Sequence, residues 1–241
     1  MWLNSLDVAL LGGVICLDRV FLQAMISRPI VAGSIIGVVL SEPLTGLIIG
    51  AFIELLWIDR LPMGLYIPPN DTVAAVLATA GTILVGRELG SFSRELIALA
   101  ILLFLPSAIL ARQVDVWIIK TNDRLSQKAT EYARLGDIKG LAREHRYGIV
   151  KVFAGAFLII FVCLVPGVVL LKWTFPILPE RVLKALLYTY FFIPILGIAV
   201  ALNTIKLRGA VPLFAGLFLL ATLVMGAVSY THLTLPTKRI V

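Results

Sequence analysis

The sequence has little charge. Only 15% of its 241 residues are Asp, Glu, Lys or Arg, whereas 60% are hydrophobic, and the mean hydropathy is +1.01. A soluble globular domain has about 25% charged and about 45–50% apolar residues, because it must cover its core with polar surface. The shortage of charge therefore excludes an ordinary soluble domain and predicts an all-α polytopic membrane protein.

Cysteine and histidine are also scarce, with two of each. Cys16 and Cys163 lie in apolar segments, without the spacing of a metal site or a disulfide framework. The sequence also lacks a phosphate-binding Gly-rich loop with a lysine, a paired-histidine motif and a nucleophile signature. We therefore expect no cofactor, no metal and no catalytic residue, so that the chain is not an enzyme on its own.

Long apolar segments follow one another along the chain. A helix of about 20 apolar residues crosses the hydrocarbon core of a bilayer. Segments that approach or exceed this length are Leu6–Ile26, Pro29–Ile58, Thr72–Val85, Leu96–Ile119, Ile149–Leu171, Val182–Ile205 and Ala210–Tyr230. They predict several transmembrane helices.

The segment Pro29–Ile58 is interrupted by Ser41, Glu42 and Pro43. Each half is too short to span alone, and proline cannot donate a backbone hydrogen bond. Such a break persists at membrane depth only where protein or a water-filled cavity satisfies the freed backbone groups. We therefore predict broken or re-entrant helices that face an interior cavity; the alternative is an ordinary pair of spans with a tight external turn.

A polar, basic connector at residues 120–148 separates an N-terminal membrane region, 1–119, from C-terminal transmembrane helices at 149–230. The net charge of the chain is +7, and the basic residues gather here rather than on a nucleic-acid-binding surface. Thr121–Arg124 resembles a helix cap, which predicts an amphipathic helix ending near Arg134. Cytoplasmic loops are rich in Lys and Arg, so we place the connector in the cytoplasm, either as a solvated loop or as a docking surface for a partner.

The last residues, 231–241, differ abruptly from the apolar segment before them. We interpret them as a non-native tail, with the native sequence departing near Ser229, and they take no part in the functional argument.

Polar side chains within the N-terminal membrane region are functional candidates, because such groups are costly in a bilayer. They are Asp18, Gln23, Glu42, Glu54, Asp59, Asn70 and Asp71. Carboxylates and amides suit the recognition of sugar hydroxyls. Each also has a structural alternative: Asp18 could pair with Arg19, Glu54 could reach an interface beside Asp59–Arg60, and Asn70 or Asp71 could cap the next helix.

Three runs carry a resemblance to a known family: Ser27–Gly33, Gly46–Trp57, and Pro62–Gly64 leading into Ile67–Thr72. They resemble membrane component C (IIC) of the mannose/fructose/sorbose family of the phosphoenolpyruvate-dependent sugar phosphotransferase system. The resemblance is specific over residues 10 to about 90 and looser from Lys120 to Tyr230.

The resemblance implies a sugar-translocating permease subunit in a bacterial inner membrane, working with sister component D (IID) and with cytoplasmic components A and B that carry the phosphoryl group on histidines. It implies that Glu54, Asn70, Asp71 and Gln23 contact a hexose-type sugar, and we add Asp59 from the polar set. Several family members have Asp where this chain has Asn70, which leaves open whether Asn70 or Asp71 faces the sugar.

The expected function is inward passage of a hexose or hexose derivative that a partner then phosphorylates. The main alternative is an ion-coupled secondary transporter in which Asp18, Glu54 or Asp59 carries a proton or sodium ion. A non-transporting scaffold or sensor subunit is the third. Hexoses differ by single hydroxyl groups, so the residues do not name the sugar.

Overall fold

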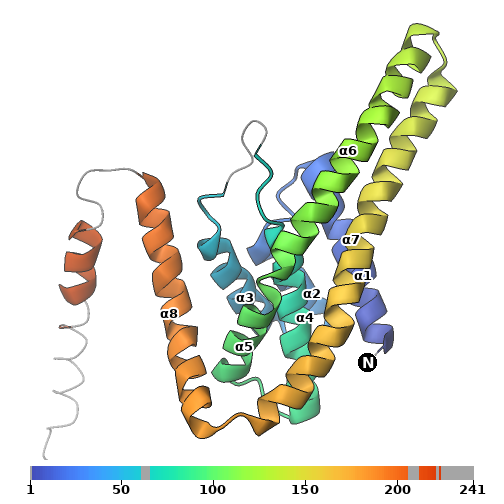
Figure 1. Ribbon diagram of the computed structural model, residues 1–241. Helices are drawn as coiled ribbons and strands as arrows, with labels where there is room; N and C mark the ends of the chain where they lie inside the picture. Colours follow the sequence, from blue (N-terminus) through green and yellow to red (C-terminus); the bar gives the residue numbers. More distant parts are fainter. Residues whose placement is uncertain (1, 61–65, 206–211, 221–222, 224–241) are drawn as a thin grey trace, which may run out of the picture.

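The computed structural model describes residues 2–60, 66–205, 212–220 and 223. Its described part is built from helices, which form a body and a long projecting arm (Figure 1). In chain order they are α1 (Trp2–Leu17), the π-helical turn η1 (Asp18–Leu22), α2 (Pro29–Val39), α3 (Pro43–Leu56), α4 (Asp71–Leu89), α5 (Arg94–Phe104), α6 (Ser107–Arg134), α7 (Ile138–Thr174), the 3₁₀ turn η2 (Phe175–Ile177) and α8 (Glu180–Ile205).

The helices α2 and α3 form a re-entrant hairpin. With 11 and 14 residues, they are about 16 and 21 Å long at 1.5 Å per residue, which is well short of a hydrocarbon core of about 30 Å. Each begins with a proline, whose fixed φ suits the first helical position. The predicted break at Ser41–Pro43 is confirmed, and the length of each helix favours a re-entrant hairpin over two full spans joined by an external turn.

Glycines let the two hairpin helices approach backbone to backbone. Gly33 and Gly37 of α2 face Gly46 and Gly50 of α3, and a Cβ atom added to Gly33 would lie 2.6 Å from the carbonyl oxygen of Gly46. Small residues four apart on both helices are the usual basis of close helix packing in membranes. The hairpin is therefore a tightly packed unit, turned at Ser41, whose φ is +58°.

Helix α4 is the centre of the body. Every residue from Thr72 to Gly86 is buried, and α4 contacts α1, α2, α3, α5, α6 and α7. Its many Ala, Thr and Gly residues explain how so many helices fit around it, because small side chains allow short distances between helix axes. Asn70 precedes α4 as its N-cap, and Gly90, with a φ of +70°, ends it in the left-handed conformation.

Pro106 divides the predicted span Leu96–Ile119 into α5 and α6. Helix α6 then continues without a break to Arg134, so the expected cap at Thr121–Arg124 is not a helix start. The physical reason is that residues 107–134 contain neither glycine nor proline, and nothing ends the transmembrane helix where its sequence turns polar. The predicted end near Arg134 is correct.

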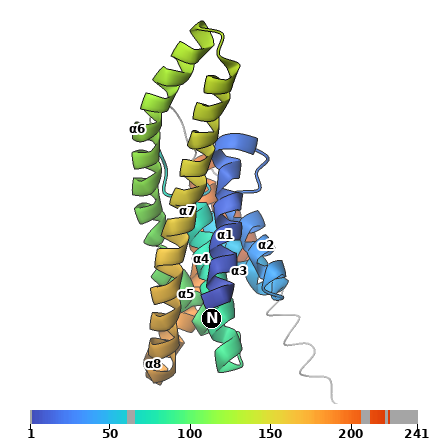
Figure 2. The ribbon, with the colours of Figure 1, turned by 90° about the vertical axis from the view of Figure 1, so that its right-hand side faces the viewer.

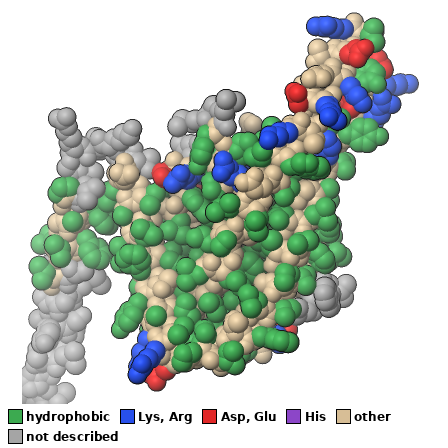
Figure 3. All heavy atoms as spheres, viewed as in Figure 1, with side chains coloured by type: hydrophobic (Ala, Val, Ile, Leu, Met, Phe, Trp, Pro, Cys, Tyr) green, Lys and Arg blue, Asp and Glu red, His purple; other side chains and the backbone are tan. Residues whose placement is uncertain are grey.

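The connector is a helical arm formed by the polar ends of α6 and α7. These two helices lie side by side and extend beyond the rest of the body (Figures 1 and 2). Gly136, with a φ of +70°, and the N-cap Asp137 form the turn at its tip. Charged side chains gather on the arm, whereas the visible face of the body is mainly hydrophobic (Figure 3). The division of the chain into two membrane regions around it stays a prediction.

Four helical segments in the described part of the chain are long and apolar enough to cross a membrane: Asp71–Leu89, Arg94–Arg134, Ile138–Ile177 and Glu180–Asn203. Helix α1 continues into η1, which together cover most of the predicted first span. Of the predicted last span, Ala210–Tyr230, residues 212–220 are helical. The run Pro62–Gly64 and the tail 231–241 lie outside the described residues.

Candidate functional site

Asp18 organises the loop between η1 and α2. Its buried carboxylate accepts hydrogen bonds from the backbone N–H of Ala24 (2.7 Å) and from both the backbone N–H and the hydroxyl of Ser27 (3.0 Å each). Three donors satisfy a buried carboxylate well. The structure thus differs from the Asp18–Arg19 ion pair considered above, since Asp18 fixes its own loop and Arg19 binds α4.

Asn70 links α4 to two other helices. Its Oδ1 accepts hydrogen bonds from Nη1 of Arg19 (2.8 Å) and from the backbone N–H of Val73 (3.2 Å), while its Nδ2 donates to Oδ2 of Asp115 on α6 (2.9 Å). Its backbone N–H donates to the carbonyl of Ala108 at 2.9 Å. The capping role expected for Asn70 or Asp71 is therefore confirmed for Asn70, which is 3% exposed.

Asp71 occupies a more open position than Asn70. Its Oδ1 accepts hydrogen bonds from Nη1 of Arg19 at 3.1 Å and from the backbone N–H of Thr72 at 2.9 Å, and its side chain is 23% exposed. For its other oxygen, Oδ2, no hydrogen bond is found within the described part of the chain. Asp71 lines a cavity, whereas Asn70 lies behind it.

Glu54 joins the two helices of the re-entrant hairpin. Its Oε2 accepts a hydrogen bond from the backbone N–H of Ile30 at 3.1 Å, and its Oε1 lies 3.3 Å from Nη1 of Arg28. The N-terminus of a helix has free N–H groups and a partial positive charge. A carboxylate from α3 at the start of α2 therefore stabilises the open end of the hairpin.

The turn η1, the loop before α2, the stretch after α3 and the start of α4 surround a cavity of about 220 Å³. It is smaller than the range of about 300–1,000 Å³ usual for ligand pockets. Its lining combines cationic, anionic, hydroxyl and aromatic side chains, namely Arg19, Ser27, Arg28, Trp57, Arg60, Asp71 and Thr72. Such a set can bind hydroxyl groups and anions. Among the described residues, no group of three or more His, Cys, Asp or Glu residues is placed to hold a metal ion.

The other two predicted sugar contacts lie away from this lining. Gln23 is exposed in the loop after η1, in the left-handed conformation with a φ of +53°. Asp59 is exposed beyond α3, and its Oδ1 lies 3.4 Å from Nε of Arg60, which does line the cavity. The structure thus brings Asp71 into the cavity, places Glu54 and Asn70 directly behind its lining, and leaves Gln23 and Asp59 at the periphery.

Two residues of the candidate site were not predicted from the sequence. Asp115 is a carboxylate within the predicted span Leu96–Ile119, and the rule for intramembrane ionisable residues would have identified it as a candidate. Arg19 was considered only as a partner of its neighbour Asp18. Its contacts with Asn70 and Asp71 join positions more than 50 residues apart, and no local sequence pattern encodes such a pairing.

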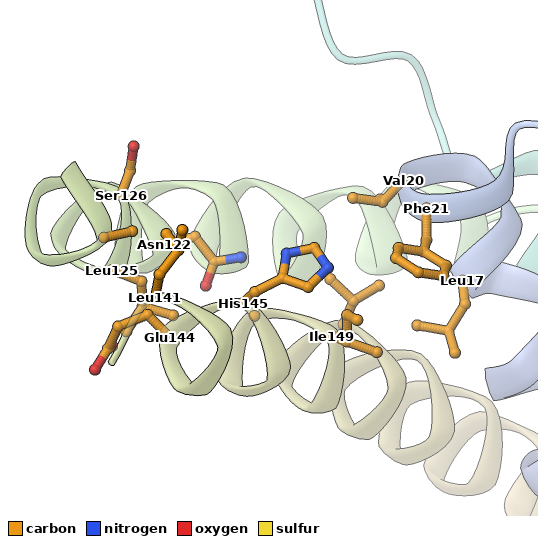
Figure 4. A pocket seen from close by; sticks show the side chains of 13 residues that line it. Leu17, Val20, Phe21, Asn122, Leu125, Ser126, Leu141, Glu144, His145 and Ile149 are labelled. Carbon is orange, nitrogen blue, oxygen red and sulfur yellow. The ribbon is translucent and has the colours of Figure 1, made fainter. Parts of the chain in front are cut away.

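A second cavity, of about 290 Å³, lies where the arm meets the end of α1 (Figure 4). Leucine, valine, isoleucine and Phe21 form most of its lining, and the ring centroid of His145 lies 5.8 Å from that of Phe21. Figure 4 shows the Ser126 hydroxyl and the Glu144 carboxylate directed away from the other labelled side chains. Its apolar character makes it a poor site for a sugar, which needs many hydrogen-bonding partners.

Comparison with known families gives a match over nearly the whole chain. The model of the family described as the sorbose-specific IIC component of the phosphotransferase system matches residues 2–235. The chain belongs to this family. It is therefore a permease subunit of a sugar phosphotransferase system, as the runs Ser27–Gly33 and Gly46–Trp57 predicted.

Curated proteins similar to this IIC chain include IIC components from three bacteria. It is 26% identical over 225 residues to the fructose permease IIC component of Bacillus subtilis (strain 168), with 91% of this chain and 80% of that protein covered. It is 25% identical over 244 residues to the sorbose-specific EIIC component of Lacticaseibacillus casei, with 95% and 83% covered. A shorter match, 36% identical over 59 residues, covers 24% of this chain and 44% of the putative N-acetylgalactosamine permease IIC component 2 of Escherichia coli (strain K12).

Solved structures share the fold of this IIC chain. A structure titled only as a membrane protein has a TM-score of 0.69 and 21% identity, covering 99% of this chain and 98% of that one. A chain of the mannose transporter ManYZ in complex with microcin E492 has a TM-score of 0.58 and 20% identity, covering 100% and 99%. At these identities the likeness concerns the fold, and it confirms an all-α polytopic membrane protein.

Proposed function

We propose that this subunit carries a hexose or hexose derivative across the bacterial inner membrane to a partner that phosphorylates it, and that the cavity at the start of α4 is its sugar site. The observation that carries this proposal is the lining of that cavity. A carboxylate, two hydroxyl side chains, an aromatic ring and free guanidinium donors meet there, at the junction of the re-entrant hairpin with the central helix.

The chemistry of the lining suits a sugar. Oδ2 of Asp71, which has no hydrogen bond among the described residues, can accept from a sugar hydroxyl, and the guanidinium groups can donate to one. The hydroxyl of Ser27 donates to Asp18, so its oxygen is left as an acceptor, whereas the hydroxyl of the buried Thr72 is bonded to the Ser27 carbonyl and holds that loop against α4. Trp57 offers an apolar face for the C–H groups of a sugar ring.

The surroundings of the cavity suit release toward the cytoplasm. The loops before α2 and after α3, together with the start of α4, lie at the end of the body from which the basic arm projects (Figure 1). Lys and Arg are enriched on the cytoplasmic side of membrane proteins. We therefore place the mouth of the cavity at the cytoplasmic face, where a phosphorylating partner has access.

The roles of Asn70 and Asp71 differ in this proposal. Asp71 contacts the sugar, because it lines the cavity. Asn70 is a positioning residue, since its carbonyl and amide groups are used by Arg19, Val73 and Asp115. Glu54 acts through Arg28 and α2 rather than by direct contact, and contacts from Gln23 and Asp59 stay predictions.

Phosphoryl transfer itself is assigned to other polypeptides. His145 lies on the arm among the residues lining the apolar cavity, and His232 lies outside the described residues. By resemblance to the family, components A and B carry the phosphoryl group and component D completes the membrane pathway. The basic arm offers these partners a cytoplasmic surface.

Membrane vesicles containing this chain with its neighbouring components test the proposal. We expect labelled hexoses from a panel to become sugar phosphates only when phosphoenolpyruvate and this subunit are both present. Asp71→Asn should remove most of this activity, while the exposed control Glu180→Gln on α8 should keep it. Uptake of free sugar without phosphoenolpyruvate, abolished by an ionophore, would instead establish a gradient-driven carrier and refute the proposal.

A further inference from the structure

Three arginines from separate segments line the cavity at the start of α4. Arg19 comes from η1, Arg28 from the loop before α2, and Arg60 from the stretch after α3, whereas Asp71 is the one carboxylate among the described lining residues. Three cations against one anion leave the lining with a formal charge of +2. A site for a neutral sugar does not need such an excess, because hydroxyl groups are satisfied by neutral donors and acceptors.

The acidic partners of Arg28 and Arg60 stand behind the cavity, whereas Asp71, the partner of Arg19, lines it. Glu54 contacts Arg28 while also accepting the N–H of Ile30, and Asp59 contacts Arg60 from an exposed position. Neither carboxylate belongs to the lining. They lower the cost of holding guanidinium groups in this place. With Asp71 they balance the formal charge of the three arginines, but Arg28 and Arg60 face the cavity while their carboxylates do not.

Much of the hydrogen-bonding capacity of the arginines is unused. A guanidinium group has five N–H donors. In the described part of the chain, Arg28 uses Nη1 on Glu54, and Arg60 uses Nε on Asp59 and Nη1 on the Tyr66 hydroxyl. Their side chains are 41% and 53% exposed, so the remaining donors are open to a ligand.

Guanidinium groups in this arrangement match an oxyanion. Arginine binds phosphate and carboxylate groups through paired, charge-assisted hydrogen bonds, which are shorter and stronger than neutral ones. The nearby hydroxyl of Ser27 and the ring of Trp57 would contact the uncharged remainder of the ligand. The cavity therefore combines an anion-binding part with a part suited to a sugar ring.

We propose that this cavity binds an oxyanion attached to a hexose, with Arg28 and Arg60 as the groups that recognise the anion. The inference rests on the proposed function and extends it, since phosphorylation at the cytoplasmic mouth would create a sugar phosphate next to these arginines. A phosphate ester and a sugar carboxylate share this chemistry, and the phosphate ester is the form that the proposed function supplies.

Binding to the purified complex of this chain with its sister membrane component, in nanodiscs and without phosphoenolpyruvate, tests the inference. The probes are mannose, fructose and N-acetylgalactosamine, their 6-phosphates, glucuronate and inorganic phosphate, measured by titration calorimetry. We expect at least one 6-phosphate to bind about tenfold or more tightly than its parent sugar, as one or two additional charge-assisted hydrogen bonds provide. This preference should decrease with added salt.

Matched variants separate anion recognition from sugar binding. Because Arg28 and Arg60 line the sugar cavity, Arg28→Gln and Arg60→Gln should weaken the binding of both ligands, but they should weaken the phosphate ester about tenfold more than the parent sugar and so remove the preference. Arg181→Gln, an exposed arginine at the start of α8, should change neither affinity. Because Arg28 also contacts Glu54, the Arg60 variant keeps the test valid if the Arg28 variant fails to fold.

Each outcome decides the inference. Tighter binding of glucuronate than of the phosphate esters would support an anionic hexose and make a sugar acid the ligand. Three results would overturn the inference. Sugars and their phosphates could bind with equal affinity, or the arginine variants could weaken the binding of sugar and sugar phosphate equally. Inorganic phosphate alone could also bind as tightly as the sugar phosphates. If the vesicles phosphorylate a hexose but no anionic form is preferred, the proposed function stands and this inference fails; if no hexose is bound or phosphorylated, the proposed function itself fails.

Discussion

Replacing Gly33 by alanine tests whether the re-entrant hairpin holds the sugar site in place. A Cβ atom at Gly33 would lie 2.6 Å from the carbonyl oxygen of Gly46 and 3.0 Å from the Cα of Gly50, whereas ordinary van der Waals contact begins at 3.4 Å. The neighbouring atoms are backbone, so no side chain can rotate away. The two helices must therefore separate by about 0.8 Å, the difference between 3.4 and 2.6 Å.

The size of the effect follows from this separation. Extra atoms forced into a well-packed interface cost about 1–3 kcal/mol, partly because contacts along both helices lose dispersion energy. At about 2–4 °C per kcal/mol for a chain of this size, the midpoint of thermal unfolding should fall by several degrees. Glu54 would also be displaced from the N–H of Ile30, which moves Arg28 at the cavity, so sugar phosphorylation should fall as well.

The assay combines thermal unfolding of the purified protein in detergent with sugar phosphorylation by vesicles. Gly148→Ala on α7 is the matched control, because the nearest atom to an added Cβ is Nδ2 of Asn122 at 4.0 Å. That change should be neutral or stabilise by about 0.5–1 kcal/mol, as alanine replaces glycine within a helix. A Gly33→Ala protein as stable and active as the unchanged chain would show that the hairpin helices are not in backbone contact there.

Three further changes probe other parts of the structure by thermal unfolding and by the same phosphorylation assay. Phe104→Ala removes a ring that is 3% exposed between glycines of α4 and α7, and should cost about 3–5 kcal/mol; a change below 1 kcal/mol would contradict this packing. Glu88→Gln breaks an exposed ion pair with Lys172. It should lower the free energy of unfolding by less than about 1 kcal/mol and leave phosphorylation unchanged. A larger loss of stability would show that this exposed contact contributes more than surface ion pairs usually do. Asp18→Asn leaves a donor of the Ser27 loop unpaired, so it should lower the free energy of unfolding by about 1–3 kcal/mol and reduce phosphorylation. Full activity would show that this loop is not needed for the sugar site.

The membrane fold was largely predictable from the sequence, because the length of an apolar segment and the position of proline act locally. Pro43 with Ser41 and Glu42 predicted the break that became the hairpin turn. The end of α6 was also predicted near Arg134, yet its start was misplaced at Thr121. A polar sequence can resemble a cap within a helix, and only an actual breaker such as Pro106 interrupts the backbone hydrogen bonds.

The candidate site was less predictable. Asn70 could be recognised as a cap because capping depends on residues three positions apart. The contacts of Arg19 with Asp71 and of Asn70 with Asp115 depend on how η1, α4 and α6 pack, and a single sequence does not show how helices far apart in the chain pack. For the same reason the sequence left open which residue of the Asn70–Asp71 pair reaches the cavity.

The re-entrant hairpin also determines how the chain is threaded through the bilayer. A hairpin that enters and leaves at one face puts residues 23–28 and 57–60 on the same side of the membrane, and the pair α2–α3 then adds no net crossing. Counting the apolar stretch Pro29–Ile58 as a single crossing would invert α4 and every helix after it, the arm included, relative to α1. Reporter tags placed in these two loops should therefore give the same sidedness, and a hairpin of this kind sets the orientation of every later helix without crossing the membrane itself.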